Sequence, residues 1–129
     1  SSEDNFTHKA KILKEVFQFG PETNFIKAYR AISPADKLKY NLPDIESDDY
    51  VNLLNNKSWI DFLGMENSHY TLEELIIVVR KIAKPVNSKN WKELNKSDPK
   101  IPKYPEYYYP NFSYRAFEKI GKPVQKIDL

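Results

Sequence analysis

The chain has 129 residues, no cysteine, 29% charged residues and a formal net charge of only +2. The lack of cysteine excludes disulfides, a thiolate nucleophile and a zinc–thiolate site, and no apolar run is long enough to cross a membrane. With 40% hydrophobic and 14% aromatic residues, the composition is that of a folded domain. We expect a soluble, intracellular protein. Because the sequence begins with serine instead of methionine, we also expect a processed chain or a piece of a longer one.

Helical periodicity dominates the first half of the chain. Apolar residues recur at helical spacing from about Asn5 to Gln18, and Gly20 is expected to end that helix. Ser33 precedes a proline and an acidic residue, which is a typical helix start. The other helices predicted in this half are short: residues 24–32, one starting at Ser47, and 58–63 with Gly64 as its end.

The second half begins with a capping box, in which Thr71 and Glu74 are three residues apart. It predicts a helix to about Lys84, with an apolar stripe made of Leu72, Leu75, Ile76, Val79 and Ile82 and widened by Ile77 and Val78. Ser88 and Ser113 are expected to cap two further short helices, the second ended by Gly121. Between them lies a stretch in which proline forbids α-helix, at Pro99, Pro102, Pro105 and Pro110.

The fold class predicted from these patterns is all-α, since no stretch alternates long enough to indicate a strand. The three glycines all fall where a helix is expected to end. The order of parts also repeats: a long helix, a short aromatic helix, a proline turn, a tyrosine and a last short aromatic helix. We therefore predict two tandem related units of short helices with Pro-rich connections, residues 1–66 and 67–123, followed by a tail at 124–129.

The residues that carry this repeat resemble a known family. Residues 57–64, Lys57-Ser58-Trp59-Ile60-Asp61-Phe62-Leu63-Gly64, and the second-half pattern of residues 70–74, 79–81, Trp91, 99–102 and Tyr109 look like the phage-integrase repeat unit. This family is a small tandem helical repeat found in some mobile-element integrases and in other proteins. The resemblance implies a helical repeat without a catalytic domain. No arginine–His-x-x-Arg–tyrosine set is present, so we predict a protein that is not an enzyme.

Charge is distributed unevenly between the two predicted units. Residues 1–66 carry 8 Lys/Arg and 11 Asp/Glu, a balance of −3, whereas residues 67–129 carry 12 and 7, a balance of +5. A basic stripe of this kind favours phosphate binding. We therefore predict that the second unit binds DNA or RNA. The candidate nucleic-acid-binding residues are Arg80, Lys81, Lys84, Lys89, Lys92, Lys96, Lys100, Lys103 and Arg115, with Tyr107 or Tyr108 stacking on bases.

Two other interpretations stay open. The basic stripe is also consistent with an ordinary solvated face. Alternatively, exposed tyrosines and the acidic first unit form a docking face for another protein. We predict no metal and no cofactor, because the acidic residues around Asp49 lack the glycine and glutamate of a calcium loop and neither His8 nor His69 has a second ligand at suitable spacing. Trp59 and Trp91 are expected in the core, and Tyr109 is expected to pack inward like Tyr50.

Overall fold

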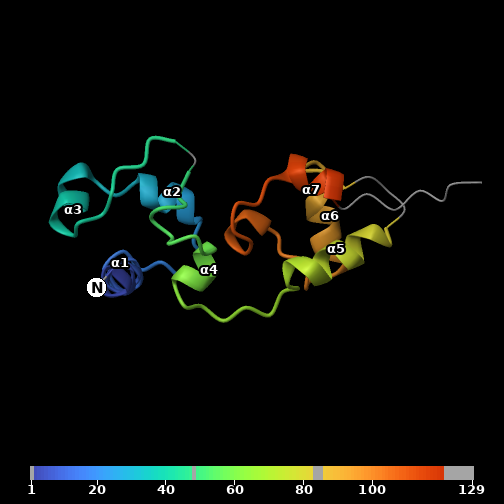
Figure 1. Ribbon diagram of the computed structural model, residues 1–129, viewed down its shortest axis with the longest axis horizontal. Coiled ribbons are helices and arrows are strands. Elements are labelled where there is room, and N and C mark those ends of the chain that lie inside the picture. Colours follow the sequence, from blue (N-terminus) through green and yellow to red (C-terminus); the bar gives the residue numbers. More distant parts are fainter. Residues whose placement is uncertain (1, 48, 83–85, 121–129) are drawn as a thin grey trace, which may run out of the picture. The chain divides into compact units, whose positions relative to one another are not determined.

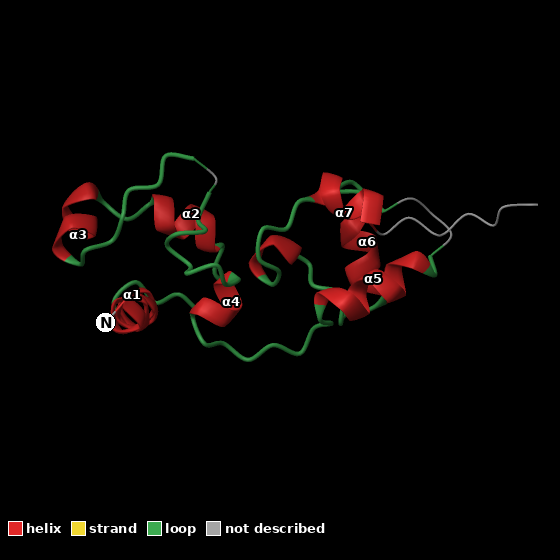
Figure 2. Ribbon diagram, in the orientation of Figure 1, coloured by secondary structure: helices red, strands yellow, loops and turns green. Residues whose placement is uncertain are grey.

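The computed structural model describes residues 2–47, 49–82 and 86–120 (Figure 1). All regular elements within these ranges are helical and none is a strand, which confirms the all-α prediction (Figure 2). The chain divides into two units, Ser1–Glu66 and Asn67–Leu129, called unit 1 and unit 2 below. Among the described helices, none is long and apolar enough to span a bilayer. Lys84, Gly121 and the predicted tail 124–129 lie outside the described residues.

Unit 1 contains four helices: α1 (Ser2–Glu15), α2 (Phe25–Arg30), α3 (Pro34–Lys39) and α4 (Trp59–Phe62). The last three each begin at a polar residue whose side-chain oxygen accepts a hydrogen bond from the backbone N–H three residues on. These caps are Asn24, Ser33 and Ser58. Each cap satisfies one of the unpaired donors at a helix start, so short helices with little internal cooperativity have defined starting points.

Aromatic rings form the centre of unit 1. Trp59 is 2% exposed, and its ring centre lies 5.5 Å from that of Phe25, 5.5 Å from Tyr50 and 6.2 Å from Tyr29. The Tyr29 hydroxyl donates to the carbonyl oxygen of Pro43, and burial raises the pKa of Tyr29 above its usual range. The predicted core position of Trp59 is therefore confirmed, and the ring cluster connects α2 and α4 to the loop between them.

Two predictions for unit 1 are wrong. The segment after Ser47 contains turns at 51–56 and no helix, because Asn55 and Asn56 take left-handed φ angles of 52° and 61° that end the helical path. Gly20 does not end α1. That helix ends at Glu15, and the left-handed residue after it is Gln18, with φ 58°. Gly64 has φ 65° directly after α4, where the prediction placed a helix end.

Unit 2 contains α5 (Leu72–Arg80), α6 (Trp91–Ser97), the 3-10 turn η1 (Pro105–Tyr107) and α7 (Tyr114–Ile120). The predicted capping box is confirmed: the Glu74 N–H donates to Thr71 Oγ1 at 3.2 Å and the Thr71 N–H donates to Glu74 Oε1 at 3.0 Å. Ser113 caps α7 as predicted, accepting from the Ala116 N–H at 3.1 Å.

The core of unit 2 surrounds Trp91, which is 1% exposed, as predicted. Its indole Nε1–H donates to the Pro102 carbonyl oxygen at 2.7 Å. Tyr109 is 4% exposed and its hydroxyl donates to the Tyr70 carbonyl oxygen at 2.6 Å, so it packs inward as expected. The buried residues of this cluster are Leu75, Val79, Val86, Trp91, Ile101, Tyr109 and Phe117. They hold the proline-rich segment against α5, α6 and α7.

Several local predictions for unit 2 need correction. α5 ends at Arg80, before the expected end near residue 84, and Ile77 is 57% exposed, outside the buried stripe. Ser88 does not cap α6. Asn87 Oδ1 accepts the Asn90 N–H at 3.2 Å, and α6 begins directly after Asn90. The proline-rich stretch also contains the 3-10 turn η1, which tolerates proline at its first position.

The same local arrangement precedes the last helix of each unit. Residues 56–58 and 111–113 both read Asn-x-Ser, and Asn56 and Asn111 have left-handed φ angles of 61° and 56°. Each serine then caps the helix, and the hydrogen bond that it accepts is 3.1 Å long in both units. Asparagine tolerates the left-handed region better than most residues, which explains its presence at both positions.

Candidate nucleic-acid interface

The lysines of α6 lie on its solvent face. Trp91 is buried, and the Asn95 Nδ2–H donates to the Ile101 carbonyl oxygen at 2.7 Å, so these two side chains define the inner face. Lys92 and Lys96 are four residues apart and therefore lie one above the other on the outer face. Lys89 precedes the helix by two residues. All three lysines are exposed, and we call them the α6 lysine row.

None of the α6 lysine row is neutralised by an ion pair in the described part of the chain. An ion pair does join Lys37 Nζ to Asp44 Oδ1 at 3.4 Å, but both residues belong to unit 1. The one acidic residue among the first two turns of α6 is Glu93, which is exposed. Two unpaired ammonium groups on one helix face and a third just before the helix give a local positive potential that attracts anions.

Two further lysines follow α6 and lie over aromatic rings. The Lys100 Nζ is 5.6 Å from the centre of the Tyr70 ring, and the Lys103 Nζ is 5.6 Å from that of Tyr104. Both lysines are exposed. A cation over a ring at an exposed site is held weakly, by about 0.5–1 kcal/mol, so these ammonium groups keep the freedom to move onto a phosphate.

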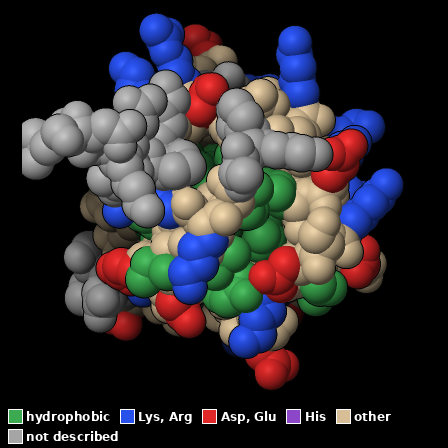
Figure 3. Space-filling model, turned by 90° about the vertical axis from the view of Figure 1, so that its right-hand side faces the viewer, with side chains coloured by type: hydrophobic (Ala, Val, Ile, Leu, Met, Phe, Trp, Pro, Cys, Tyr) green, Lys and Arg blue, Asp and Glu red, His purple; other side chains and the backbone are tan. Residues whose placement is uncertain are grey.

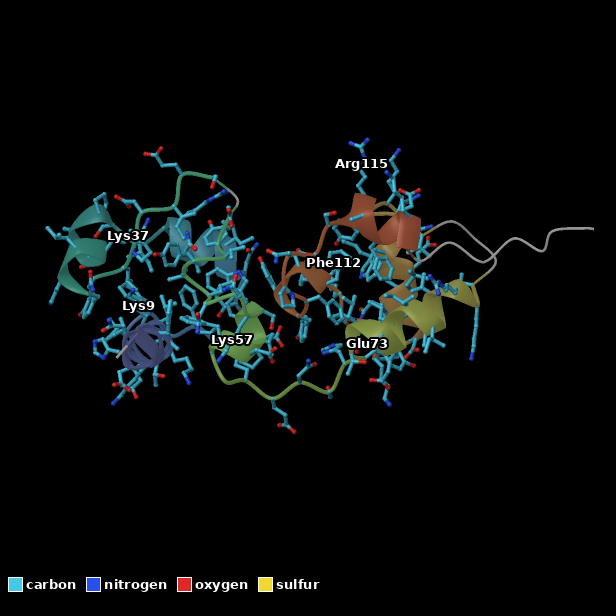
Figure 4. All side chains as sticks on the ribbon, in the orientation of Figure 1. Lys9, Lys37, Lys57, Glu73, Phe112 and Arg115 are labelled. Atoms are coloured by element: carbon cyan, nitrogen blue, oxygen red, sulfur yellow. The ribbon has the colours of Figure 1, made fainter. Side chains whose placement is uncertain are left out.

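The remaining basic candidates lie elsewhere on unit 2. Arg80 and Lys81 are exposed at the end of α5, and Arg115 projects outward from α7, away from the side of unit 2 on which Glu73 lies (Figure 4). Lys84 lies outside the described residues. The face in Figure 3 carries basic and acidic side chains interleaved around an apolar centre. Of the predicted basic residues, Lys92 and Lys96 are the pair that share one helix, α6.

The two tyrosines predicted to stack on bases are not openly exposed. Tyr107 is 7% exposed, so its ring faces are covered by the rest of unit 2. Tyr108 is partly buried, and its ring centre is 4.3 Å from that of His69. Burial also lowers the pKa of His69, whose Nδ1 has no hydrogen-bond partner among the described residues. These rings are structural parts of unit 2.

Sequence reasoning missed Tyr104, which is 47% exposed. Pro102 and Pro105 are both fully buried, and the two residues between them, Lys103 and Tyr104, are exposed. The spacing of the prolines is a signal in the sequence that could have indicated this exposed pair. A rigid proline packed on each side favours a short turn that points outward. Tyr104 is the exposed aromatic ring nearest in sequence to the predicted lysines.

Two of the grooves formed by the described residues differ in size and in the character of their linings. An apolar groove of about 100 Å³ in unit 2 is smaller than the ~300–1,000 Å³ of typical ligand pockets. It is lined by Leu72, Ile76, Tyr109, Pro110, Asn111, Phe112, Ser113, Ala116 and Phe117. A wider groove of about 550 Å³ in unit 1 is lined by Pro43, Asp44, Ile45, Glu46, Ser47, Asp49, Asn52 and Leu53. No group of three or more histidine, aspartate and glutamate side chains in the described ranges is arranged to hold a metal ion.

Comparison of the chain with protein-family models, with curated proteins and with solved structures finds no match.

Proposed function

We propose that unit 2 binds nucleic acid by contacting its phosphates through the α6 lysine row. The observation that carries this proposal is the set of three exposed lysines in and just before α6, Lys89, Lys92 and Lys96, without an ion-pair partner among the described residues. Lys100 and Lys103 extend this surface beyond the end of α6. Arg80, Lys81 and Arg115 are further exposed basic candidates elsewhere on unit 2.

The charge balance of the two units supports this proposal. Unit 1 carries 8 basic and 11 acidic residues and unit 2 carries 12 and 7, so the balances are −3 and +5. Like charges four residues apart on a helix, such as Lys92 and Lys96, destabilise it by about 0.2–0.5 kcal/mol. A bound phosphate removes that repulsion and releases counterions, which is the main driving force of backbone recognition.

Residue type indicates how the surface recognises its ligand. Lysine outnumbers arginine 17 to 3 in the chain. An ammonium is a point charge and lacks the planar fork with which arginine reads guanine edges. We therefore expect contacts to phosphates, with little sequence preference. The proposed protein is a binding module of an intracellular system that performs no reaction itself.

We also propose that the two units are related repeats similar to the phage-integrase repeat unit. An aromatic side chain of the second helix donates to a proline carbonyl in each unit: Tyr29 to Pro43 and Trp91 to Pro102. A buried tyrosine follows each proline by seven residues (50 − 43 = 7 and 109 − 102 = 7). The repeated Asn-x-Ser start of the last helix supports the same relationship.

The proposal is tested by measuring binding to labelled 20-nucleotide DNA and RNA, single-stranded and duplex, over a range of salt. We expect the logarithm of the binding constant to fall linearly with the logarithm of the salt concentration, with a slope of about −2 to −4.5 for three to five phosphate contacts. A Lys89→Glu/Lys92→Glu/Lys96→Glu variant is expected to lose at least 10-fold in affinity at low salt.

The matched control reverses three lysines of unit 1, with Lys11→Glu/Lys14→Glu/Lys27→Glu. These side chains are also exposed, and this variant has the same net charge as the first one. We expect this control variant to keep most of the wild-type affinity, because the proposed phosphate contacts depend on where the lysines lie and less on the net charge of the chain. No binding by the wild-type chain at low salt, or equal losses in both variants, contradicts the proposal.

A second candidate function is docking of a basic protein segment on unit 1. The observation that favours it is the groove that contains Asp44, Glu46 and Asp49 beside the apolar side chains of Ile45 and Leu53. An Asp44→Lys/Glu46→Lys/Asp49→Lys variant tests it in calorimetric titration with a lysine-rich peptide. Binding by the wild type that this variant loses supports docking, whereas no heat with the wild type excludes it for such peptides.

A further inference from the structure

One exposed aromatic side chain in unit 2 has no role in the core. Tyr104 is 47% exposed, whereas Tyr107 and Tyr109 are 7% and 4% exposed. The Lys103 ammonium lies 5.6 Å from the centre of the Tyr104 ring. An aromatic ring beside a mobile cation is the combination that single-stranded nucleic acid uses, because bases stack on the ring and phosphates pair with the cation.

The backbone that carries Tyr104 is fixed on both sides. Pro102 and Pro105 are fully buried, and the Pro102 carbonyl accepts the indole N–H of Trp91. The Tyr104 carbonyl accepts the Tyr107 N–H at 3.0 Å. A ring held on an ordered turn loses little conformational freedom when a ligand binds, so more of its contact energy contributes to affinity.

Tyr107 supports the exposed ring from the core side. Its ring centre is 5.9 Å from that of Tyr104, with the two planes tilted by 45°. Because Tyr107 is buried, it limits the positions that Tyr104 can take. Tyr107 therefore acts as a positioning residue for the ring that it contacts.

We propose that Tyr104 is a base-stacking platform for single-stranded nucleic acid, with Lys103 and Lys100 contacting the phosphates next to the stacked base. This inference rests on the proposed function of unit 2 and names the form of nucleic acid that it prefers. When a base stacks on Tyr104, the Lys103 ammonium leaves the ring and moves to a phosphate. Lys100 is four residues away, at most ~14 Å along an extended chain, so it reaches the same short strand.

The platform discriminates between single strands and duplexes. A base within a duplex already stacks on its neighbours, and its face is closed to a protein ring. An unpaired base has a free face, and stacking tolerates all four bases. The α6 lysine row contacts phosphates in either form, whereas Tyr104 adds affinity only for the single strand.

The test compares the affinity of the full chain and its Tyr104→Ala and Tyr104→Phe variants for a 20-nucleotide oligothymidine and a 20-base-pair duplex. We expect Tyr104→Ala to weaken single-strand binding about 10-fold and to change duplex binding less than 2-fold. Tyr104→Phe keeps the ring, so it retains single-strand affinity within about 2-fold of the wild type.

Unit 1 offers a matched control in its own lysine–tyrosine pair. The Lys39 Nζ lies 5.3 Å from the centre of the Tyr40 ring, but this pair belongs to the acidic unit. We expect Tyr40→Ala to bind oligothymidine as the wild type does. Photocrosslinking of wild-type chain to 5-iodouracil oligonucleotide provides a readout that needs no variant, and we expect the crosslinked peptide to contain Tyr104.

The outcomes separate this inference from the proposed function. Suppose that the wild type binds oligothymidine in a salt-dependent way. If Tyr104→Ala then binds equally well, or if the crosslink lies outside residues 103–105, Tyr104 is not a stacking platform, but the proposed phosphate binding is unaffected. If the wild type binds neither single strand nor duplex, both proposals are wrong. An equal loss of single-strand and duplex affinity in Tyr104→Ala also overturns the platform, because the ring is then not selective.

Discussion

Tyr50 in unit 1 and Tyr109 in unit 2 are equally buried, at 4% exposure each, but they are held differently. The Tyr109 hydroxyl donates to the Tyr70 carbonyl, 39 residues away, and so fastens the end of the proline-rich segment to the start of α5. The Tyr50 hydroxyl has no partner in the described structure, and its ring packs against Trp59 and Tyr29. Unit 1 therefore depends on ring packing at this position, whereas unit 2 adds a hydrogen bond over a long sequence distance.

The two units differ more in their surfaces than in their cores. Each buries one tryptophan, and in each an aromatic residue donates to a proline carbonyl. Their charge balances are nevertheless opposite, −3 and +5. The difference between the units that bears on the proposed binding is therefore the charge of their surfaces.

The largest effect is expected for the tryptophans. Trp91→Ala removes a fully buried ring and leaves the Pro102 carbonyl without its donor, so we expect a loss of about 4 kcal/mol in the stability of unit 2. Trp59 is then the single tryptophan, and its fluorescence follows the unfolding of unit 1 in urea. We expect the urea midpoint of unit 1 to differ little from that of the wild type. The unfolding of unit 2, followed by circular dichroism, should shift to a much lower urea concentration.

The reciprocal variant completes this test. Trp59→Ala removes the centre of the unit 1 ring cluster, and Trp91 fluorescence then reports unit 2. If either substitution shifts the transitions of both units equally, the units unfold together and their cores are not separate cooperative regions.

The tyrosine hydroxyls are expected to give effects of opposite sign. Tyr109→Phe removes the hydroxyl that donates to the Tyr70 carbonyl in a partly buried position, and it is expected to lower stability by about 1–2 kcal/mol. Tyr50→Phe removes a buried hydroxyl without a partner, so stability stays the same or rises by up to about 1 kcal/mol. Urea denaturation of both variants measures the contrast. Equal destabilisation would show that Tyr50 also depends on its hydroxyl.

The smallest effect concerns the capping box of unit 2. The hydrogen bonds that Glu74 makes with Thr71 hold its pKa below the ordinary value of 4.5, and Lys100 adds to this. The stabilisation is therefore complete above pH 4.5 and is lost as the pH falls through the lower folded-state pKa. We expect Thr71→Ala to lower stability by about 1 kcal/mol at pH 7 and to reduce the acid dependence. Thermal unfolding of the wild type and the variant at pH 7 and pH 3 measures the loss of stability and its pH dependence. If both proteins lose the same stability between pH 7 and pH 3, the capping box is not the source of the acid dependence.

Local signals in the sequence predicted the parts of the fold that local interactions decide. Thr71 and Glu74 form both of their capping hydrogen bonds within one turn of α5, and Ser113 accepts from the Ala116 N–H three residues on. Because these contacts are local, the starts of α5 and α7 could be predicted from the sequence. The burial of Trp59 and Trp91 follows from their apolar neighbours on short helices. Gly20 misled the prediction because Gln18 takes the left-handed conformation two residues earlier.

The candidate site was less predictable, because exposure depends on contacts distant in sequence. Tyr104 and Tyr107 have the same chemistry, and only the folded unit shows that Tyr107 is covered while Tyr104 is open. The α6 lysine row could be predicted as basic from composition. The solvent face shared by Lys92 and Lys96 follows from the folded unit, in which Trp91 is buried and Asn95 donates to the Ile101 carbonyl.

Chemical-shift mapping of the full chain shows whether nucleic acid binds to unit 2 at the exposed surface formed by α6 and the segment that follows it. Oligothymidine is titrated into isotope-labelled protein at low salt, and the amide signals of both units are followed. We predict shifts concentrated at residues 89–104, which reverse when the salt concentration is raised. Shifts concentrated in unit 1, or no shifts in either unit, would contradict the account.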